Sequence, residues 1–219
     1  MQNNTDRVTL YKWASNLAVI TIGYNILEGI ISIFFGIEDE TLALFGFGLD
    51  SFVEVISGAG IWHMVKRIRD NGNETLDRFE SQALKITGVA FYILSFGLIV
   101  SAINNISQGH KPETTLWGVI ISSVSILVMW VMIHYKTIIG KALQSEAILA
   151  DASCAKTCIY LSVILLIASI GYEITGIGGI DAIGAIGIAI FSFREGREAF
   201  MKSKGEKCCC QDTCGIKTD

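Results

Sequence analysis

Residues 84–106 of the chain read LKITGVAFYILSFGLIVSAINNI, a run in which Lys85 is the only charged side chain. A helix needs about 20 mostly apolar residues to cross the roughly 30 Å hydrocarbon core of a bilayer. This run has that length, and it lacks the strand-sized alternation of apolar and polar residues that is typical of a membrane β-barrel. The stretch therefore predicts a helix that spans a membrane.

Comparable apolar runs recur along the whole chain. With the run above, they predict spans at residues 13–35, 41–65, 84–106, 116–135, 146–172 and 180–200. Hydrophobic residues make up 51% of the 219 positions, charged residues make up 17%, and the mean hydropathy is +0.51. A soluble protein is usually less apolar and richer in charge. We therefore expect an all-α, integral membrane bundle of six helices in residues 1–200, followed by a short cysteine-rich tail in residues 201–219.

The placement of basic residues predicts the orientation of this bundle. Of the 17 Lys and Arg residues, only Lys111 lies in a loop that faces outward when the N-terminus is inside, and only Lys156 lies deep within a span. Lys and Arg concentrate in the cytosolic loops of membrane proteins. We therefore expect both termini in the cytosol and a multi-pass protein, located in a prokaryotic cell (inner) membrane, with no nucleic-acid partner.

Two carboxylates lie in the predicted second span, within GFGLDSFVE at residues 46–54. Asp50 and Glu54 are four residues apart, so they share one helix face about one turn apart. An ionisable group inside a span costs about 2.5–3.5 kcal/mol on insertion scales, and such groups usually have a function. Two carboxylates this close repel each other unless a proton or a cation lies between them. The pair therefore indicates a cation site, and the alternative is a pair that hydrogen-bonds to other helices or lies near the interface.

The predicted fifth span repeats this spacing with thiols, in LADASCAKTC at residues 149–158. Cys154 and Cys158 share one helix face in the same way. If the two faces meet, they present two carboxylates and two thiols, a set that suits a tetrahedral divalent ion. Taken alone, this cysteine pair is at least as well explained by packing, because buried Cys often acts as a small hydrophobic residue. The matched spacing on the other span favours metal ligands.

Three further acidic residues are candidates for a secondary ion path: Glu28 in the first span, Asp151 near the cytosolic mouth, and Asp181 at the start of the sixth span. Asp151 is equally well explained by hydrogen bonding at the polar end of its span, and Asp181 by helix capping. Lys156 lies between the two cysteines and should point away from their face. We expect it to pair with Glu28, to extend its amine towards water, or to tune the site.

Four more cysteines lie in the polar tail: Cys208, Cys209, Cys210 and Cys214. In the cytosol, thiols usually stay reduced, so disulfides are not expected here. The tail cysteines are candidates to capture a soft metal ion and pass it to the transport site. Their spacing matches no recognised zinc finger, and a palmitoylation site or a disordered thiol cluster is the alternative.

These residues resemble the cation diffusion facilitator family of divalent-metal exporters. The fifth span of that family usually reads A-D-x-x-H-x-x-x-D, and residues 150–158 fit this frame, with Cys154 in the place of His and Cys158 in the place of Asp. The family's D-x-x-x-D in the second span is matched by Asp50 and Glu54, and its Asp at the start of the sixth span by Asp181.

The resemblance covers roughly residues 10–200 and implies six spans with cytosolic ends, a homodimer, and metal export coupled to proton influx. The chain departs from the family in two ways. Thiols replace the usual His and Asp, and we expect the usual cytosolic C-terminal domain to be absent, as in some relatives. A dimer would then have to rest on the membrane helices.

The thiols also bear on the expected substrate. Thiolates are softer than imidazole or carboxylate and favour Zn, Cd and softer ions over Mg, Ca or Mn. A free thiol has a pKa of about 8.5, so metal binding at neutral pH must displace its proton. We therefore expect a secondary transporter, with no resident cofactor and no enzymatic activity, that exports Zn or Cd, or another thiophilic ion, by proton antiport. Its ligands would be Asp50, Glu54, Cys154 and Cys158.

Alternatives from other classes of protein remain open. The chain could be a membrane metal sensor or buffer, or a dithiol redox protein, without net transport. A redox role needs a disulfide between Cys154 and Cys158, and sulfurs at this spacing on one helix are poorly placed for disulfide geometry. A small multidrug exporter would use the acidic pair for organic cations but leaves the cysteines without a role.

Overall fold

The computed structural model describes residues 4–71 and 78–204, except for the side chains at 4–8, 71, 146, 147, 150, 153 and 154. Within these residues the chain forms six helices, α1 (Asn4–Glu38), α2 (Leu42–Asn71), α3 (Arg78–Gln108), α4 (Leu116–Leu143), α5 (Glu146–Thr175) and α6 (Gly179–Ser203). Each helix coincides with one predicted span. The prediction of an all-α bundle of six helices is confirmed.

Most of the helices are longer than the apolar runs that predicted them. α1 begins at Asn4 and α3 at Arg78, and α2 continues to Asn71, so polar and charged residues extend the helices beyond the apolar core. Nothing in these extensions interrupts the backbone hydrogen bonding, because the only proline, Pro112, lies in the loop between α3 and α4. Hydropathy therefore located the spans but not the ends of the helices.

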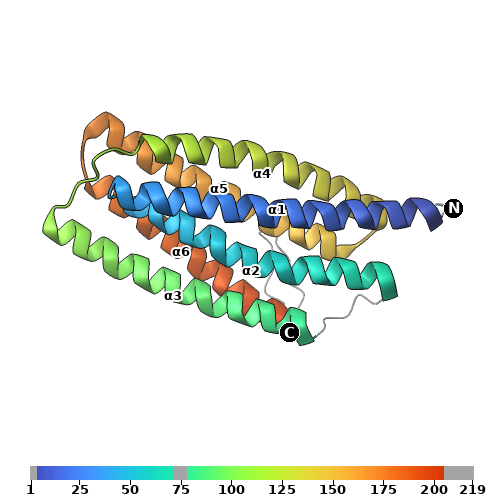
Figure 1. Ribbon diagram of the computed structural model, residues 1–219. Coiled ribbons are helices and arrows are strands. Elements are labelled where there is room, and N and C mark those ends of the chain that lie inside the picture. The colour runs from blue at the N-terminus through green and yellow to red at the C-terminus, as the bar shows by residue number, and fades with distance from the viewer. Residues whose placement is uncertain (1–3, 72–77, 205–219) are drawn as a thin grey trace, which may run out of the picture.

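The helices lie side by side along one long axis (Figure 1). α1 packs against α2 and α4 against α5 as consecutive pairs, whereas α3 packs mainly against α6, its distant neighbour in sequence. α2 also contacts α3, α5 and α6, which makes it the helix with the most neighbours. The start of α1 and the end of α6 lie at the same end of the bundle (Figure 1), as an even number of spans requires.

The surface of the bundle is strongly apolar. Ile93, Phe96 and Leu127 are each more than 60% exposed, at 68%, 72% and 66%. Helices α1 to α5 are long and apolar enough to cross a membrane. In α6, the apolar stretch between Asp181 and Arg194 is shorter than about 20 residues, but the helix runs along the bundle beside α3 (Figure 1). The chain is a multi-pass membrane protein.

The centre of the bundle is packed by a cluster of buried side chains from α2, α3, α4, α5 and α6, which includes Leu44, Leu98, Ile121, Leu165 and Ile188. α6 approaches its neighbours closely through small residues. A Cβ atom built at Gly187 would lie 3.0 Å from Ile164 of α5, and one at Gly184 would overlap Ala168 of α5. Glycines of α6 thus permit tight packing within the bundle.

Candidate cation site

Asp50 is fixed inside the bundle by α6. Its side chain is 2% exposed, and its Oδ1 atom accepts a hydrogen bond of 2.9 Å from the hydroxyl of Ser192. Ser192 is itself fully buried. The first of the two predicted carboxylates therefore faces the interior and connects α2 to α6.

Glu54, one turn further along α2, connects three helices. The thiol of Cys158 on α5 donates a hydrogen bond of 2.7 Å to Oε1 of Glu54. The amide Nδ2 of Asn25 on α1 donates one of 2.9 Å to Oε2. Asn25 thus forms an interhelical hydrogen bond, and Glu54 and Cys158 lie side by side.

The distance between Cys158 and Glu54 is that of a hydrogen bond and leaves no room for an ion between the two atoms. A tetrahedral zinc ion lies about 2.3 Å from sulfur and about 2.0–2.2 Å from oxygen, which places the two ligand atoms about 3.6 Å apart. The Sγ and Oε1 atoms are 2.7 Å apart, so the two side chains would have to separate by about 1 Å to admit the ion. The proton of this hydrogen bond and an ion could therefore not lie between the two atoms at the same time.

Glu28 of α1 lies in the same buried polar region. It is 5% exposed and accepts hydrogen bonds from the hydroxyl groups of Tyr24, at 2.8 Å, and Ser51, at 3.0 Å. Ser51 follows Asp50 directly, which places Glu28 near the acidic pair of α2. Lys156 is exposed, and within the part of the chain that the structure describes no ion pair connects it to Glu28.

Asp151 forms an ion pair at the beginning of α5. Its Oδ2 atom lies 3.0 Å from the Nζ atom of Lys136 on α4, whose side chain is only 4% exposed. A buried lysine needs a partner of opposite charge, and Asp151 supplies it. These contacts are those of an ion pair that joins α4 to the beginning of α5.

Asp181, at the other end of the bundle, is 1% exposed. Its two carboxylate oxygens accept hydrogen bonds from the backbone N–H groups of Leu42, at 2.8 Å, and Ala43, at 3.2 Å. These are the first two residues of α2, where backbone donors have no partner within the helix. Asp181 therefore caps α2 from the first turn of α6, and its charge also complements the helix dipole.

Several predicted residues lie outside the described residues. The backbone of Cys154 is helical, but its side chain is not described. The tail cysteines Cys208, Cys209, Cys210 and Cys214 also lie outside. Among the side chains that are described, no group of three or more His, Cys, Asp or Glu residues is arranged to hold a metal ion.

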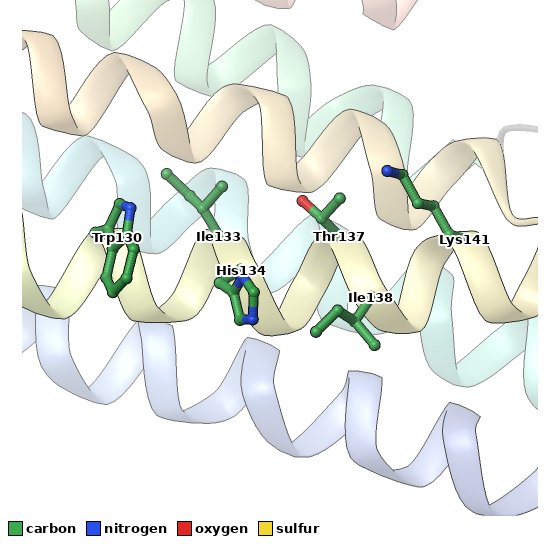
Figure 2. A pocket seen from close by; sticks show the side chains of 6 residues that line it. All are labelled: Trp130, Ile133, His134, Thr137, Ile138 and Lys141. Carbon is green, nitrogen blue, oxygen red and sulfur yellow. The ribbon is translucent and has the colours of Figure 1, made fainter.

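A surface hollow lies away from these acidic groups. Figure 2 shows that all six lining residues belong to α4, and these are Trp130, Ile133, His134, Thr137, Ile138 and Lys141. None of them is a carboxylate or a thiol. The hollow therefore has the wrong chemistry for a cation site, and the acid–thiol cluster remains the candidate.

Sequence reasoning missed two residues of α6 that belong to this region. Ser192 binds Asp50, and Glu195 accepts a hydrogen bond of 3.0 Å from the hydroxyl of Thr157 on α5. Glu195 lies among charged residues near the end of the predicted span, which is usually a solvated position. Its three-residue spacing from Ser192 was the available indication that both share one helix face.

A buried cluster of carboxylates and a thiol among membrane-spanning helices is the arrangement of a membrane transporter of cations. The sequence comparison identifies the family. Residues 18–205 match the cation efflux transmembrane domain, so the chain belongs to the cation efflux family. It is also similar to an uncharacterized transporter of Methanocaldococcus jannaschii, with 27% identity over 176 residues. That match covers 78% of this chain and 62% of the relative's length.

Proposed function

We propose that this cation transporter exports Zn²⁺ or Cd²⁺, or a related thiophilic ion, from the cytosol in exchange for protons. The observation that carries the proposal is the contact of 2.7 Å between the Cys158 thiol and the Glu54 carboxylate. A soft sulfur and a hard oxygen side by side suit a borderline ion such as Zn²⁺ better than Mg²⁺ or Ca²⁺.

The exchange follows from the chemistry of this pair. A cation that reaches Glu54 from the cytosol binds its carboxylate and the sulfur of Cys158, and the thiol proton leaves to water. Asp50, one turn away, and Cys154, by its spacing, would complete the ligand set. When the site opens outward, protons return to the sulfur and the carboxylates and displace the ion. Each cycle thus moves a cation and protons in opposite directions.

The separation of Cys158 and Glu54 provides the conformational part of the mechanism. The two side chains must move apart by about 1 Å to admit an ion, and they belong to different helices, α5 and α2. Asn25 connects Glu54 to α1 as well. Replacement of the proton of this hydrogen bond by an ion would therefore change the packing of three helices at once, which is how binding could favour the outward-open arrangement.

The family resemblance extends the proposal to a homodimer in a prokaryotic cell (inner) membrane. A partner subunit would have to pack against the outward apolar faces of the helices, which are otherwise exposed to lipid. The tail cysteines remain candidates for cytosolic metal capture.

Metal uptake into proteoliposomes with an acidic lumen tests the function. We expect Zn²⁺ and Cd²⁺ to accumulate with the pH gradient and uptake to fall at least about 10-fold when an ionophore abolishes it, while Mn²⁺ and Mg²⁺ move slowly. Uptake at a rate that does not depend on the pH gradient would contradict proton antiport. Equal rates for Mn²⁺ and Cd²⁺ would contradict the proposed substrate class.

Two replacements of Cys158 form a matched control. Cys158→Ser keeps the size and a hydrogen-bond donor to Glu54 but removes the soft ligand. Cys158→Asp supplies the hard carboxylate that the family frame has at this position. We expect Cys158→Ser to impair the uptake of both Cd²⁺ and Zn²⁺. Cys158→Asp should restore Zn²⁺ uptake more than Cd²⁺ uptake. If Cys158→Ser transports Cd²⁺ like the unmodified chain, sulfur is not a ligand.

A further inference from the structure

Glu195 lies at the same level of the bundle as the proposed ligands, but on a third helix. Ser192 of α6 contacts Asp50, and Glu195 lies three residues further along α6, about 4.5 Å along the helix axis. Glu54 lies one turn beyond Asp50 in the same direction, because α2 and α6 both run from the loop ends near Asp181 towards the other end of the bundle. Glu195 is therefore beside the Glu54 and Cys158 level.

The Glu195 carboxylate binds a hydroxyl, and the positive charges of Lys202 and Arg194 act on it without forming an ion pair. Its carboxylate accepts a hydrogen bond of 3.0 Å from the hydroxyl of Thr157, the residue next to Cys158. Among the described residues it forms no ion pair, whereas Glu198, one turn on, lies 2.8 Å from Lys202. The side chain is half-buried. Its negative charge interacts electrostatically with the carboxylates of Asp50 and Glu54. A cation beside Glu195 would reduce the mutual repulsion of these three charges.

A second observation also indicates a cation here. The amide oxygen Oδ1 of Asn25 is buried and has no hydrogen-bond partner, although the nitrogen of the same amide binds Glu54. A buried acceptor without a donor costs free energy, and a cation beside it would remove that cost. The region around Glu54 therefore has one more oxygen than its protein donors can satisfy.

Building on the proposed function, we propose that Glu195 is a cation-binding carboxylate of the transport site, contributed by α6, which receives the incoming ion beside Glu54 and Cys158. Asp50 is almost fully buried, whereas Glu54 and Glu195 are half-buried, so an ion reaches these two first. Glu195 would raise the local concentration of the cation and then share it with the sulfur and carboxylate of α5 and α2.

The test separates the charge of Glu195 from its hydrogen bond. Glu195→Gln keeps the size and the acceptor oxygen for Thr157 but removes the charge, whereas Thr157→Val removes the donor and keeps the charge. Initial rates of Zn²⁺ uptake by the full chain in proteoliposomes are measured over a range of Zn²⁺ concentrations. For Glu195→Gln we expect KM to rise at least about 10-fold and the maximal rate to change less than about 3-fold. Thr157→Val and the charge-preserving Glu195→Asp should each change KM less than about 3-fold.

Glu198→Gln is the matched control, because it removes a carboxylate from the same helix one turn away. Its KM should stay within about 2-fold of the unmodified chain. An unchanged KM in Glu195→Gln, or equal effects of Glu195→Gln and Thr157→Val, would overturn the role of Glu195. Zinc affinity of the purified, monodisperse variants in detergent provides the same comparison if Glu195→Gln inserts poorly into liposomes. Failure of the unmodified chain to move Zn²⁺ would instead refute the proposed function.

Discussion

The beginning and the middle of α2 each contact a buried carboxylate, but the two carboxylates are held in different ways. Asp181, at the beginning of α2, is held by two backbone N–H groups. Glu54, about three turns further along α2, is held by the side chains of Cys158 and Asn25. Backbone donors cannot move away without unwinding a helix. Side-chain donors can rotate or lose a proton, and a cation can then take their place.

We expect this difference to separate structural acidic residues from the proposed cation ligands better than burial does. Asp181 and Asp50 are both almost fully buried, at 1% and 2% exposure. The Asp50 carboxylate accepts a hydrogen bond from the Ser192 hydroxyl, whereas Asp181 completes the backbone hydrogen bonding of α2. The kind of donor therefore predicts what each replacement should do.

Replacement of Glu54 should have the largest effect on transport. Glu54→Gln keeps the shape of the side chain but removes the charge that a cation requires. We expect uptake in proteoliposomes to fall at least about 100-fold, which corresponds to about 2.7 kcal/mol in the transport barrier. The midpoint of thermal unfolding in detergent should change little, because Gln still bonds to its neighbours.

Asp181→Asn is the reciprocal control for this experiment. Asn keeps one acceptor oxygen and loses the other together with the charge, so α2 keeps part of its cap. We expect a lower unfolding midpoint and transport within about 3-fold of the unmodified chain once the protein is inserted. A normal midpoint with abolished transport would assign Asp181 to the ion path, and normal transport in Glu54→Gln would remove Glu54 from the site.

The ion pair between Lys136 and Asp151 should show the next largest effect, on stability. Asp151→Ala leaves Lys136 buried without its partner, which costs about 3–5 kcal/mol in a fully buried pair. The pair lies near the helix ends, where the lysine can extend towards water, so we expect about 2 kcal/mol. The unfolding midpoint in detergent should fall by about 4–8 °C.

The double variant Lys136→Met, Asp151→Leu decides between the two interpretations of Asp151. Apolar side chains of similar size can replace a buried ion pair with little loss of stability. We expect both the unfolding midpoint and transport to recover. A stable double variant with poor transport would place Asp151 on the ion path, as the family frame allows.

Much of the fold could be predicted from the sequence, because each span is a long apolar run and only helices satisfy their own backbone in lipid. The ends of the helices could not, because charged residues continue α2 and α3 without a break. The spacing of Asp50 and Glu54 showed that they share a face of one helix. It did not show which residue faces them across the bundle, because the register between helices depends on packing at sites such as Gly187.

The same limit explains the residues of α6 that were missed. Ser192 is a small polar residue that occurs throughout helices, and Glu195 lies beside Arg194 in a charged segment that reads as a solvated helix end. Only the packing of α6 against α2 and α5 brings these two residues to the acidic pair. Asp181 is the opposite case. The sequence singled it out but allowed both a helix cap and an ion path, and only the structure gives its backbone partners.

The smallest expected effect is that of Glu173, which resembles Asp181 in its partners but lies exposed at the end of α5. Its Oε1 atom accepts hydrogen bonds from the backbone N–H of Thr115, at 2.5 Å, and from the hydroxyl of Thr114, at 2.9 Å. Glu173→Ala removes this cap from the start of α4, but water can replace the lost acceptor, so we expect a cost of about 0.5–1 kcal/mol. The unfolding midpoint should fall by about 1–4 °C, and zinc uptake should stay within about 2-fold. Glu173→Gln keeps the acceptor oxygen, so its unfolding midpoint should lie between those of the unmodified chain and of Glu173→Ala. A loss of uptake in Glu173→Ala without a change in midpoint would show that backbone-held carboxylates also take part in transport, and the distinction between backbone-held and side-chain-held carboxylates would fail.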